Sequence, residues 1–333
     1  MIFQPAIIAL LLASIVSVAM LLAAAPFAVQ VIRHWDIGSG SERQLRLERR
    51  TYLFSTLTMF VMATQLAALL LFVFNADKMS EMFVGAMCAV GTLNANAFGF
   101  PALVAQMAVF FLATAWLVVN HVDTRAPDYP LVRIKYAALL VLLPAVATLL
   151  GLQLAYFLNL KADVITSCCG SLFSEEGKGL PGDVAALPAL PAMIGFYAAL
   201  AAAVANAAFH AVTRRGGYLV AVTSLAAFVV AIAGILAFVS LYIYEHPHHH
   251  CPFCILKPEY GYQGYLLYVP LFVATAAGIG AGAVQTFRHV ASLRIVVPEV
   301  SARLATVAAA GFALFAIVAT IMVARSNLLL LES

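Results

Sequence analysis

The residues with the clearest chemistry in this chain are a cysteine pair and the histidines beside it. Cys251 and Cys254 form a C-x-x-C pair. Three histidines stand directly before it, namely His248, His249 and His250. This spacing lets two sulfurs bridge, and an adjacent imidazolium or a helix N-terminus favours the reactive thiolate. The pattern predicts a redox-active dithiol with Cys251 as the nucleophile and Cys254 as its resolving partner.

The same side chains also fit a soft metal ion. Thiolates and imidazoles are ligands that suit Cu(I) and Zn(II), and residues 248–254 offer several of them. Met79, Met82 and Met87 stand shortly before Cys88. Thioether and thiolate together are a further soft-metal pattern, although methionine also serves as apolar filler. A third interpretation is a structural disulfide beside a solvated histidine turn.

Cys168 and Cys169 are neighbours in the sequence. A disulfide between neighbours is strained, because bridge geometry needs Cα atoms about 4.4–6.8 Å apart. We therefore expect each to bond a different partner, or both to bind one soft metal ion. In a thiol relay, this pair would exchange with Cys251 and Cys254, whereas in a structural role one of the two would bridge to Cys88. Five cysteines are an odd number, so the chain cannot pair all of them internally.

The elements that must position these cysteines are membrane helices. Of the 333 residues, 64% are hydrophobic and 10% are charged, and the mean hydropathy is +1.00. Soluble domains are nearer half apolar and a quarter charged. Apolar stretches long enough to cross a ~30 Å hydrocarbon core recur along the chain. A span must be helical, because lipid offers its backbone no hydrogen-bond partner.

The sequence therefore predicts an all-α polytopic bundle of about eight transmembrane helices. No segment between them is large enough for a soluble domain, so residues 1–333 are expected to form a single transmembrane domain. The expected spans are roughly 5–32, 51–75, 101–121, 136–160, 189–212, 218–244, 263–287 and 304–325.

Loop charges predict the orientation. Most of the 18 Lys and Arg residues follow the first, third, fifth and seventh spans, including an Arg-rich loop at 43–50. By the positive-inside rule these loops are cytoplasmic and both termini are extracytoplasmic. All five cysteines then lie on the extracytoplasmic side of a plasma (inner) membrane, where disulfides persist. We favour an uncleaved first helix over a signal peptide, because no basic residue precedes it.

Polar residues inside the spans limit the function classes. No Asp, Glu, Lys or Arg lies in the middle of a predicted span, which disfavours an ion-coupled carrier. The basic residues are explained by topology, so nucleic-acid binding has no support. Mild polar residues are expected to bond across helices, and these are Gln65, Gln106, Gln153, Asn159 and Asn206.

Four histidines share one depth at the predicted cytoplasmic ends, namely His34, His121, His210 and His289. Two histidines from different helices could hold a haem b. Juxtamembrane histidines beside arginine also occur without any cofactor.

The stretch from His250 to Lys257, which runs into the span at Tyr262, resembles the active-site turn of membrane thiol oxidoreductases of the DsbB and vitamin K epoxide reductase class. That class places a C-x-x-C at the outer membrane surface beside a spanning helix. A second cysteine pair lies in another outer loop, and a quinone accepts the electrons. The present chain departs from the class in having about eight spans instead of four. In the class a basic residue often follows the motif near the quinone, and Lys257 could serve as that residue. Pro258 and Glu259 interrupt the usual pattern after it.

The resemblance implies that Cys251 and Cys254 are the quinone-proximal pair. Cys168, with Cys169 or Cys88, would then be the shuttle. The leading hypothesis is an extracytoplasmic thiol–disulfide oxidoreductase that acts on a thiol protein or a small thiol. One alternative is a membrane protein that binds or transports copper or mercury. Another is a lipid-embedded structural subunit of a larger membrane complex, in which the cysteines form structural disulfides.

Overall fold

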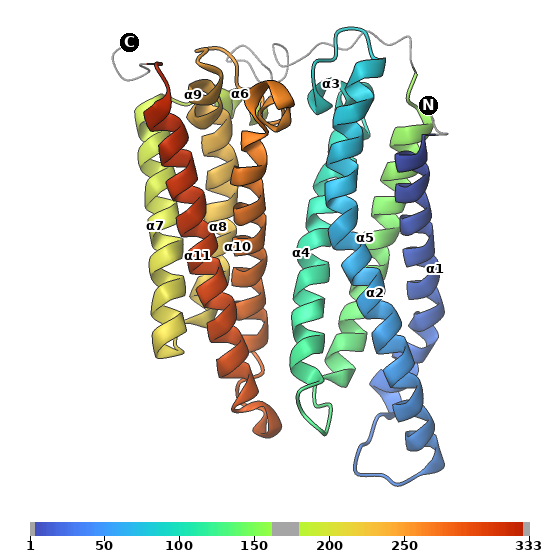
Figure 1. The fold of residues 1–333 in the computed structure, drawn as a ribbon. Helices are drawn as coiled ribbons and strands as arrows, with labels where there is room; N and C mark the ends of the chain where they lie inside the picture. Colours follow the sequence, from blue (N-terminus) through green and yellow to red (C-terminus); the bar gives the residue numbers. More distant parts are fainter. Residues whose placement is uncertain (1–3, 162–179, 329–333) are drawn as a thin grey trace. The chain divides into compact units, whose positions relative to one another are not determined.

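The computed structural model describes residues 4–161 and 180–328, and every regular element within them is helical (Figure 1). Eight of these helical stretches are long and apolar enough to cross a membrane. This confirms the predicted all-α polytopic bundle. The spanning elements are α1 (Pro5–His34), α2 (Glu42–Met79), α4 (Gly99–Asp123), α5 (Val132–Leu158), α7 (Ala189–Thr213), α8 (Gly217–Gly234), α10 (Gln263–Gln285) and α11 (Val296–Arg325).

Span α8 does not end at Gly234. It continues through a π-helical segment, Ile235–Val239, into α9 (Ser240–Tyr244). Short elements connect the other spans. They are η1 (Ser80–Met82), α3 (Ala89–Leu93), α6 (Leu180–Ala185), η3 (Cys254–Leu256), η4 (Pro258–Tyr260) and η5 (Ala291–Leu293).

Two spans begin earlier than hydropathy alone predicts. The Arg-rich segment expected as a loop forms the first turns of α2, where the Ser41 hydroxyl accepts a hydrogen bond from the Gln44 N–H at 3.3 Å. The pattern Ser-x-x-Gln is a recognised helix start. α11 likewise begins at Val296, and an ion pair between Glu299 and Arg303 stabilises its first turns. Polar helical turns therefore extend beyond the apolar windows.

The chain forms two compact units. The first comprises Met1–Asn75, Leu93–Ala162 and Thr286–Val297, and it contains α1, α4, α5 and most of α2. The second comprises Ala76–Thr92, Asp163–Gln285 and Pro298–Ser333, with α7, α8, α10 and most of α11. The expectation of a single transmembrane domain stays a prediction. Every cysteine that the structure describes belongs to the second unit.

A buried polar network joins the four long helices of the first unit. Ser14 Oγ donates to Gln153 Oε1 at 2.6 Å, and Gln153 Nε2 donates to Gln106 Oε1 at 2.9 Å. Gln106 Nε2 donates to the Gln65 carbonyl oxygen at 3.3 Å, and Gln65 Nε2 donates to Ser17 Oγ at 2.9 Å. Each such bond is worth about 0.6–2 kcal/mol in a membrane. The predicted cross-helix role of the three glutamines agrees with these contacts.

The two asparagines behave differently. Asn159 Nδ2 donates to the Ala155 carbonyl oxygen at 2.8 Å, and Asn206 Nδ2 donates to the Ala202 carbonyl oxygen at 3.0 Å. Asn159 is exposed and Asn206 is half-buried, and each side chain bonds the preceding turn of its own helix. The expectation that they bond across helices is therefore wrong. A short polar side chain reaches its own i−4 carbonyl without a neighbouring helix.

Close packing in the second unit depends on small residues where α8 meets α10. A Cβ atom at Gly278 would lie 2.0 Å from Ser224 Oγ, and one at Gly282 would lie 2.4 Å from the Ala221 Cβ. Small residues let helix backbones approach closely in a membrane, where dispersion contacts replace the hydrophobic drive. This packing fixes the two helices that lead out of and into the cysteine-bearing turn.

A buried ion pair links α4 to α5 in the first unit. Lys135 Nζ lies 2.8 Å from Asp123 Oδ2, and the two side chains are 1% and 0% exposed. Lys135 also donates to Asn120 Oδ1 at 3.2 Å, and Asp123 Oδ1 accepts from the Leu131 N–H at 2.7 Å. Hydropathy windows ended just short of both charged residues, so the pair was not expected. It ties the two helices together beside their connecting turn.

We predict that Lys135→Met lowers the free energy of unfolding by about 3–5 kcal/mol, because it leaves the Asp123 carboxylate buried without its counter-charge. The double variant Asp123→Asn/Lys135→Met should recover a large part of that loss. Unfolding in mixed detergent micelles, followed by circular dichroism, measures both. The control is Arg303→Met, which removes an exposed ion pair and should cost no more than about 1 kcal/mol. Equal losses in all three variants would contradict the assignment.

Candidate cysteine centre

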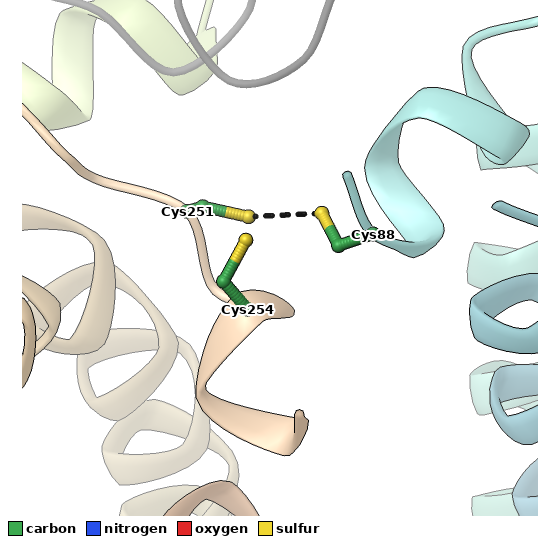
Figure 2. Close-up of side chains that lie close together, drawn as sticks. All are labelled: Cys88, Cys251 and Cys254. Atoms are coloured by element: carbon green, nitrogen blue, oxygen red, sulfur yellow. Dashed lines mark hydrogen bonds between the residues drawn. The ribbon is translucent and has the colours of Figure 1, made fainter. Parts of the chain in front are cut away.

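Three cysteine side chains meet at one end of the second unit. Cys88, Cys251 and Cys254 are 0%, 0% and 5% exposed, and their sulfurs all lie within 4.8 Å of one another. The Sγ atoms of Cys88 and Cys251 are 3.5 Å apart, and the three side chains point toward one another (Figure 2). A disulfide bond is about 2.05 Å long. Cys88 and Cys251 are therefore in contact without being bonded to each other.

Backbone contacts hold the C-x-x-C turn. Tyr244 Oη, at the end of α9, donates to the Cys251 carbonyl oxygen at 2.5 Å. Tyr268 Oη, from the second turn of α10, donates to the Pro252 carbonyl oxygen at 2.7 Å. Cys254 begins the short helix η3, whose Lys257 N–H donates to the Cys254 carbonyl oxygen at 3.0 Å. The helices on both sides of the turn thus fix its backbone.

His250 anchors the same turn from the other direction. Its ring is 2% exposed, and Nδ1 lies 2.8 Å from the carbonyl oxygen of Leu236. Leu236 belongs to the π-helical segment, where the wider turn takes its carbonyl out of the regular i→i−4 pattern. A π-helical turn commonly marks a functional site. Here the altered backbone supplies the acceptor that orients the residue next to Cys251.

The structure does not bring the predicted histidines into the sulfur cluster. His249 lies with its ring centroid 4.2 Å from that of Tyr244. His248 is exposed, and its backbone N–H donates to His246 Nδ1. Among residues 4–161 and 180–328, the group of at least three candidate metal ligands that lie together consists of cysteines alone. His248, His249 and His250 are thus separate from Cys88, Cys251 and Cys254.

Other predicted site residues fall in several places. Cys168 and Cys169 lie outside the described residues. Met79 is fully buried at the end of α2, whereas Met82 and Met87 are exposed. The methionines are therefore spread over buried and exposed positions.

The four histidines considered for haem are not equivalent. His210 is buried, with Nδ1 2.8 Å from the Arg215 carbonyl oxygen and Nε2 2.8 Å from Ser301 Oγ. Both nitrogens are thus engaged in tying α7 to its turn and to α11. The other three are exposed, and they are His34, His121 and His289. A haem iron at His210 would have to displace one of its two hydrogen bonds, so these contacts disfavour the haem interpretation.

Lys257 has an ion-pair partner that the sequence did not reveal. Its Nζ lies 3.4 Å from Asp77 Oδ1 and 3.3 Å from Ser80 Oγ. Asp77 stands in the last turn of α2, far from Lys257 in the sequence. The two tyrosines that hold the turn were also missed, because a tyrosine near a membrane surface ordinarily indicates interfacial anchoring.

Comparison with known proteins gives no match: no family model, no curated protein and no solved structure matches this chain. The geometry of the cysteine centre is therefore the main evidence for its function.

The 3.5 Å contact predicts an oxidative cross-link. In a Cys168→Ser/Cys169→Ser background with Cys254→Ser, a mild oxidant should join Cys88 to Cys251, because only a small sulfur movement separates contact from bond length. Digestion and mass spectrometry without reductant would identify the linked peptides. Replacing Cys88 by serine in the same background should abolish the link. Slow, chiefly intermolecular linkage would contradict the geometry.

Proposed function

We propose that this chain is a membrane thiol–disulfide oxidoreductase whose reaction centre is Cys88, Cys251 and Cys254. One observation carries the proposal: Cys251 Sγ lies 3.5 Å from Cys88 Sγ and within 4.8 Å of Cys254 Sγ. Cys251 Sγ is therefore the atom that two alternative disulfides would share. A reacting pair about 3–3.5 Å apart is close to an attack geometry. A purely structural disulfide needs no third sulfur at that distance.

The exchange balances within the centre. The Cys251 thiolate attacks Cys88 in a disulfide that joins Cys88 to an incoming thiol. The Cys88–Cys251 bond forms, and the incoming thiol leaves as a thiolate that takes up a proton. The Cys254 thiolate then attacks Cys251, so that Cys251–Cys254 forms and Cys88 is released. The arriving disulfide is reduced by the same two electrons that the C-x-x-C dithiol loses.

The reverse direction oxidises a client dithiol and reduces the C-x-x-C pair. Turnover then needs an acceptor of two electrons and two protons. The resemblance to the DsbB and vitamin K epoxide reductase class suggests a quinone, which would become a hydroquinone. The unit that carries the three described cysteines has four spanning stretches among its described residues, which is the number in that class. The four spans of the first unit are then the addition that distinguishes this chain.

The loop charges support a position for the centre on the extracytoplasmic side of a plasma (inner) membrane. That side is oxidising, so a protein that carries a disulfide can remain in its oxidised form there. Because the three sulfurs are buried, client thiols would react first with a shuttle pair of cysteines, and Cys168 and Cys169 are the candidates for it. A thiol protein or a small thiol is the proposed substrate.

Serine variants test the redox proposal. With purified protein, a reduced model dithiol peptide and a soluble quinone, Cys251→Ser should lower the rate of peptide oxidation at least about 100-fold, because both alternative disulfides lose their shared atom. Cys254→Ser should instead accumulate a Cys88–Cys251 bridge or a mixed disulfide, visible on non-reducing gels. Protein blocked with a thiol reagent supplies the background rate. Unchanged oxidation by Cys251→Ser would sink the proposal.

A soft-metal site is the second candidate, and the compactness of the sulfur cluster favours it. An ion bound by three thiolates at about 2.3 Å needs sulfurs about 4.0 Å apart, and all three sulfurs lie within 4.8 Å of one another. Thiolate ligands select Cu(I) and related soft ions. Zinc in a structural site would need a fourth ligand. The protein would then bind or transport copper, or mercury, which has similar chemistry.

For the metal candidate we predict about one equivalent of Cu(I) per chain under anaerobic reducing conditions, because three thiolates complete a single site. Serine replacement of any one of Cys88, Cys251 or Cys254 should weaken binding at least about tenfold, measured by competition with a colorimetric Cu(I) chelator. The Cys168→Ser/Cys169→Ser protein is the matched control, and it should bind normally. Tight binding that survives Cys88→Ser would contradict a three-sulfur site. Cysteines that react only after unfolding would instead favour a structural subunit.

A further inference from the structure

Cys88 and Cys251 lie 163 positions apart in the sequence, so something must hold their two loops together. We propose that the ion pair between Asp77 and Lys257 is the positioning device that keeps Cys88 in contact with the C-x-x-C turn. The proposal deepens the function suggested above and rests on it. Neither side chain is assigned a role in electron transfer. Their role is to set how often Cys88 reaches Cys251.

On the side of the C-x-x-C turn, Lys257 is linked to Cys254 through a single backbone hydrogen bond. Lys257 follows Cys254 by three residues, and its N–H closes the η3 turn onto the Cys254 carbonyl oxygen. Its Nζ lies 3.4 Å from Asp77 Oδ1 and donates to Ser80 Oγ at 3.3 Å. A displacement of Lys257 is therefore transmitted through one helical turn to Cys254.

The Cys88 side is reached through the segment that follows Asp77. Asp77 stands in the last turn of α2, and Ser80, which Lys257 also contacts, accepts a hydrogen bond at its carbonyl oxygen from the Phe83 N–H at 3.2 Å. The Ala86 N–H donates to the Phe83 carbonyl oxygen at 3.4 Å, and the Cys88 carbonyl oxygen accepts from the Gly91 N–H at 3.0 Å. A run of tight turns thus connects the residues that Lys257 contacts to Cys88. Removing the Asp77 carboxylate removes the charged partner that holds this segment to the C-x-x-C turn.

The ion pair of Asp77 with Lys257 is more deeply buried than a second ion pair in the same segment. Lys257 and Asp77 are 15% and 20% exposed. Lys78 and Glu81 form a second ion pair in the same segment at 3.4 Å, but these side chains are 59% and 67% exposed. Exposed pairs contribute little because water screens them, whereas partly buried pairs depend strongly on each partner. The adjacent pair is therefore a matched control for charge and for position.

The experiment measures two disulfides in one protein that lacks Cys168 and Cys169. A short pulse of mild oxidant is followed by alkylation and mass spectrometry, which report the fractions of Cys88–Cys251 and Cys251–Cys254. Asp77→Asn and Lys257→Met should each lower the initial rate of Cys88–Cys251 formation about tenfold, between the effects of exposed and buried pairs. The rate of Cys251–Cys254 formation should stay within about twofold. Lys257→Arg should retain most of the first rate, since it keeps the charge.

Glu81→Gln and Lys78→Met should leave both rates at the level of the starting protein. The proposal is overturned if Asp77→Asn leaves Cys88–Cys251 formation unchanged. It is also overturned if both disulfides slow together, because the ion pair would then support the fold of the whole turn and not the placement of Cys88. The readout needs no client and no quinone. A failed redox function with an intact rate difference would thus refute the activity and leave the positioning role standing.

Discussion

The absence of hydrogen-bond partners in lipid is the constraint on which this structure depends. A spanning backbone must satisfy its own N–H and C=O groups, which leaves helices as the solution for this chain. Polar side chains inside the spans obey the same constraint. The three glutamines of the first unit bond one another and two serines. The buried lysine of α5 meets an aspartate of α4 within 2.8 Å. These buried polar groups thus double as links between helices.

The same constraint favours positions for reactive cysteines at the ends of the spans. A reactive thiolate inside hydrocarbon would be costly, whereas the ends of helices offer backbone dipoles and polar neighbours. Cys251 and Cys254 lie in the turn between α9 and α10, and Cys88 lies in the segment between η1 and α3. The turns are nevertheless ordered, because tyrosine hydroxyls from α9 and α10 hold the backbone of Cys251 and Pro252. Close packing at Gly278 and Gly282 holds together α8 and α10, the spans on either side of the C-x-x-C turn.

Hydropathy predicted all eight spans, because apolar length alone determines which helices can cross a membrane. It failed at the starts of α2 and α11, where charged helical turns continue outside the apolar window. The Ser41 cap was readable in the sequence, so that error was avoidable. The closeness of Cys88 to Cys251 was not readable, because these residues stand 163 positions apart and meet only in the folded chain. Residue type suggested that the histidines bind a metal ion together with the C-x-x-C pair. The His250 ring instead lies against the Leu236 carbonyl oxygen.

The two proposed functions, redox exchange and metal binding, would use the same three sulfurs but require different spacings between them. A disulfide requires two sulfurs to close from 3.5 Å to about 2.05 Å, so Cys88 or Cys251 must move. An ion bound by three thiolates requires separations of about 4.0 Å and no closure. Once two of the sulfurs are bonded, a single thiolate remains for an ion, so the two states exclude each other. In the proposed positioning role, the ion pair of Asp77 with Lys257 would hold Cys88 near Cys251 without fixing its sulfur rigidly, because one partner is a flexible lysine. Such a tether permits the small movement that disulfide exchange needs, and for this reason the geometry agrees better with a carrier of disulfides than with a permanent metal site.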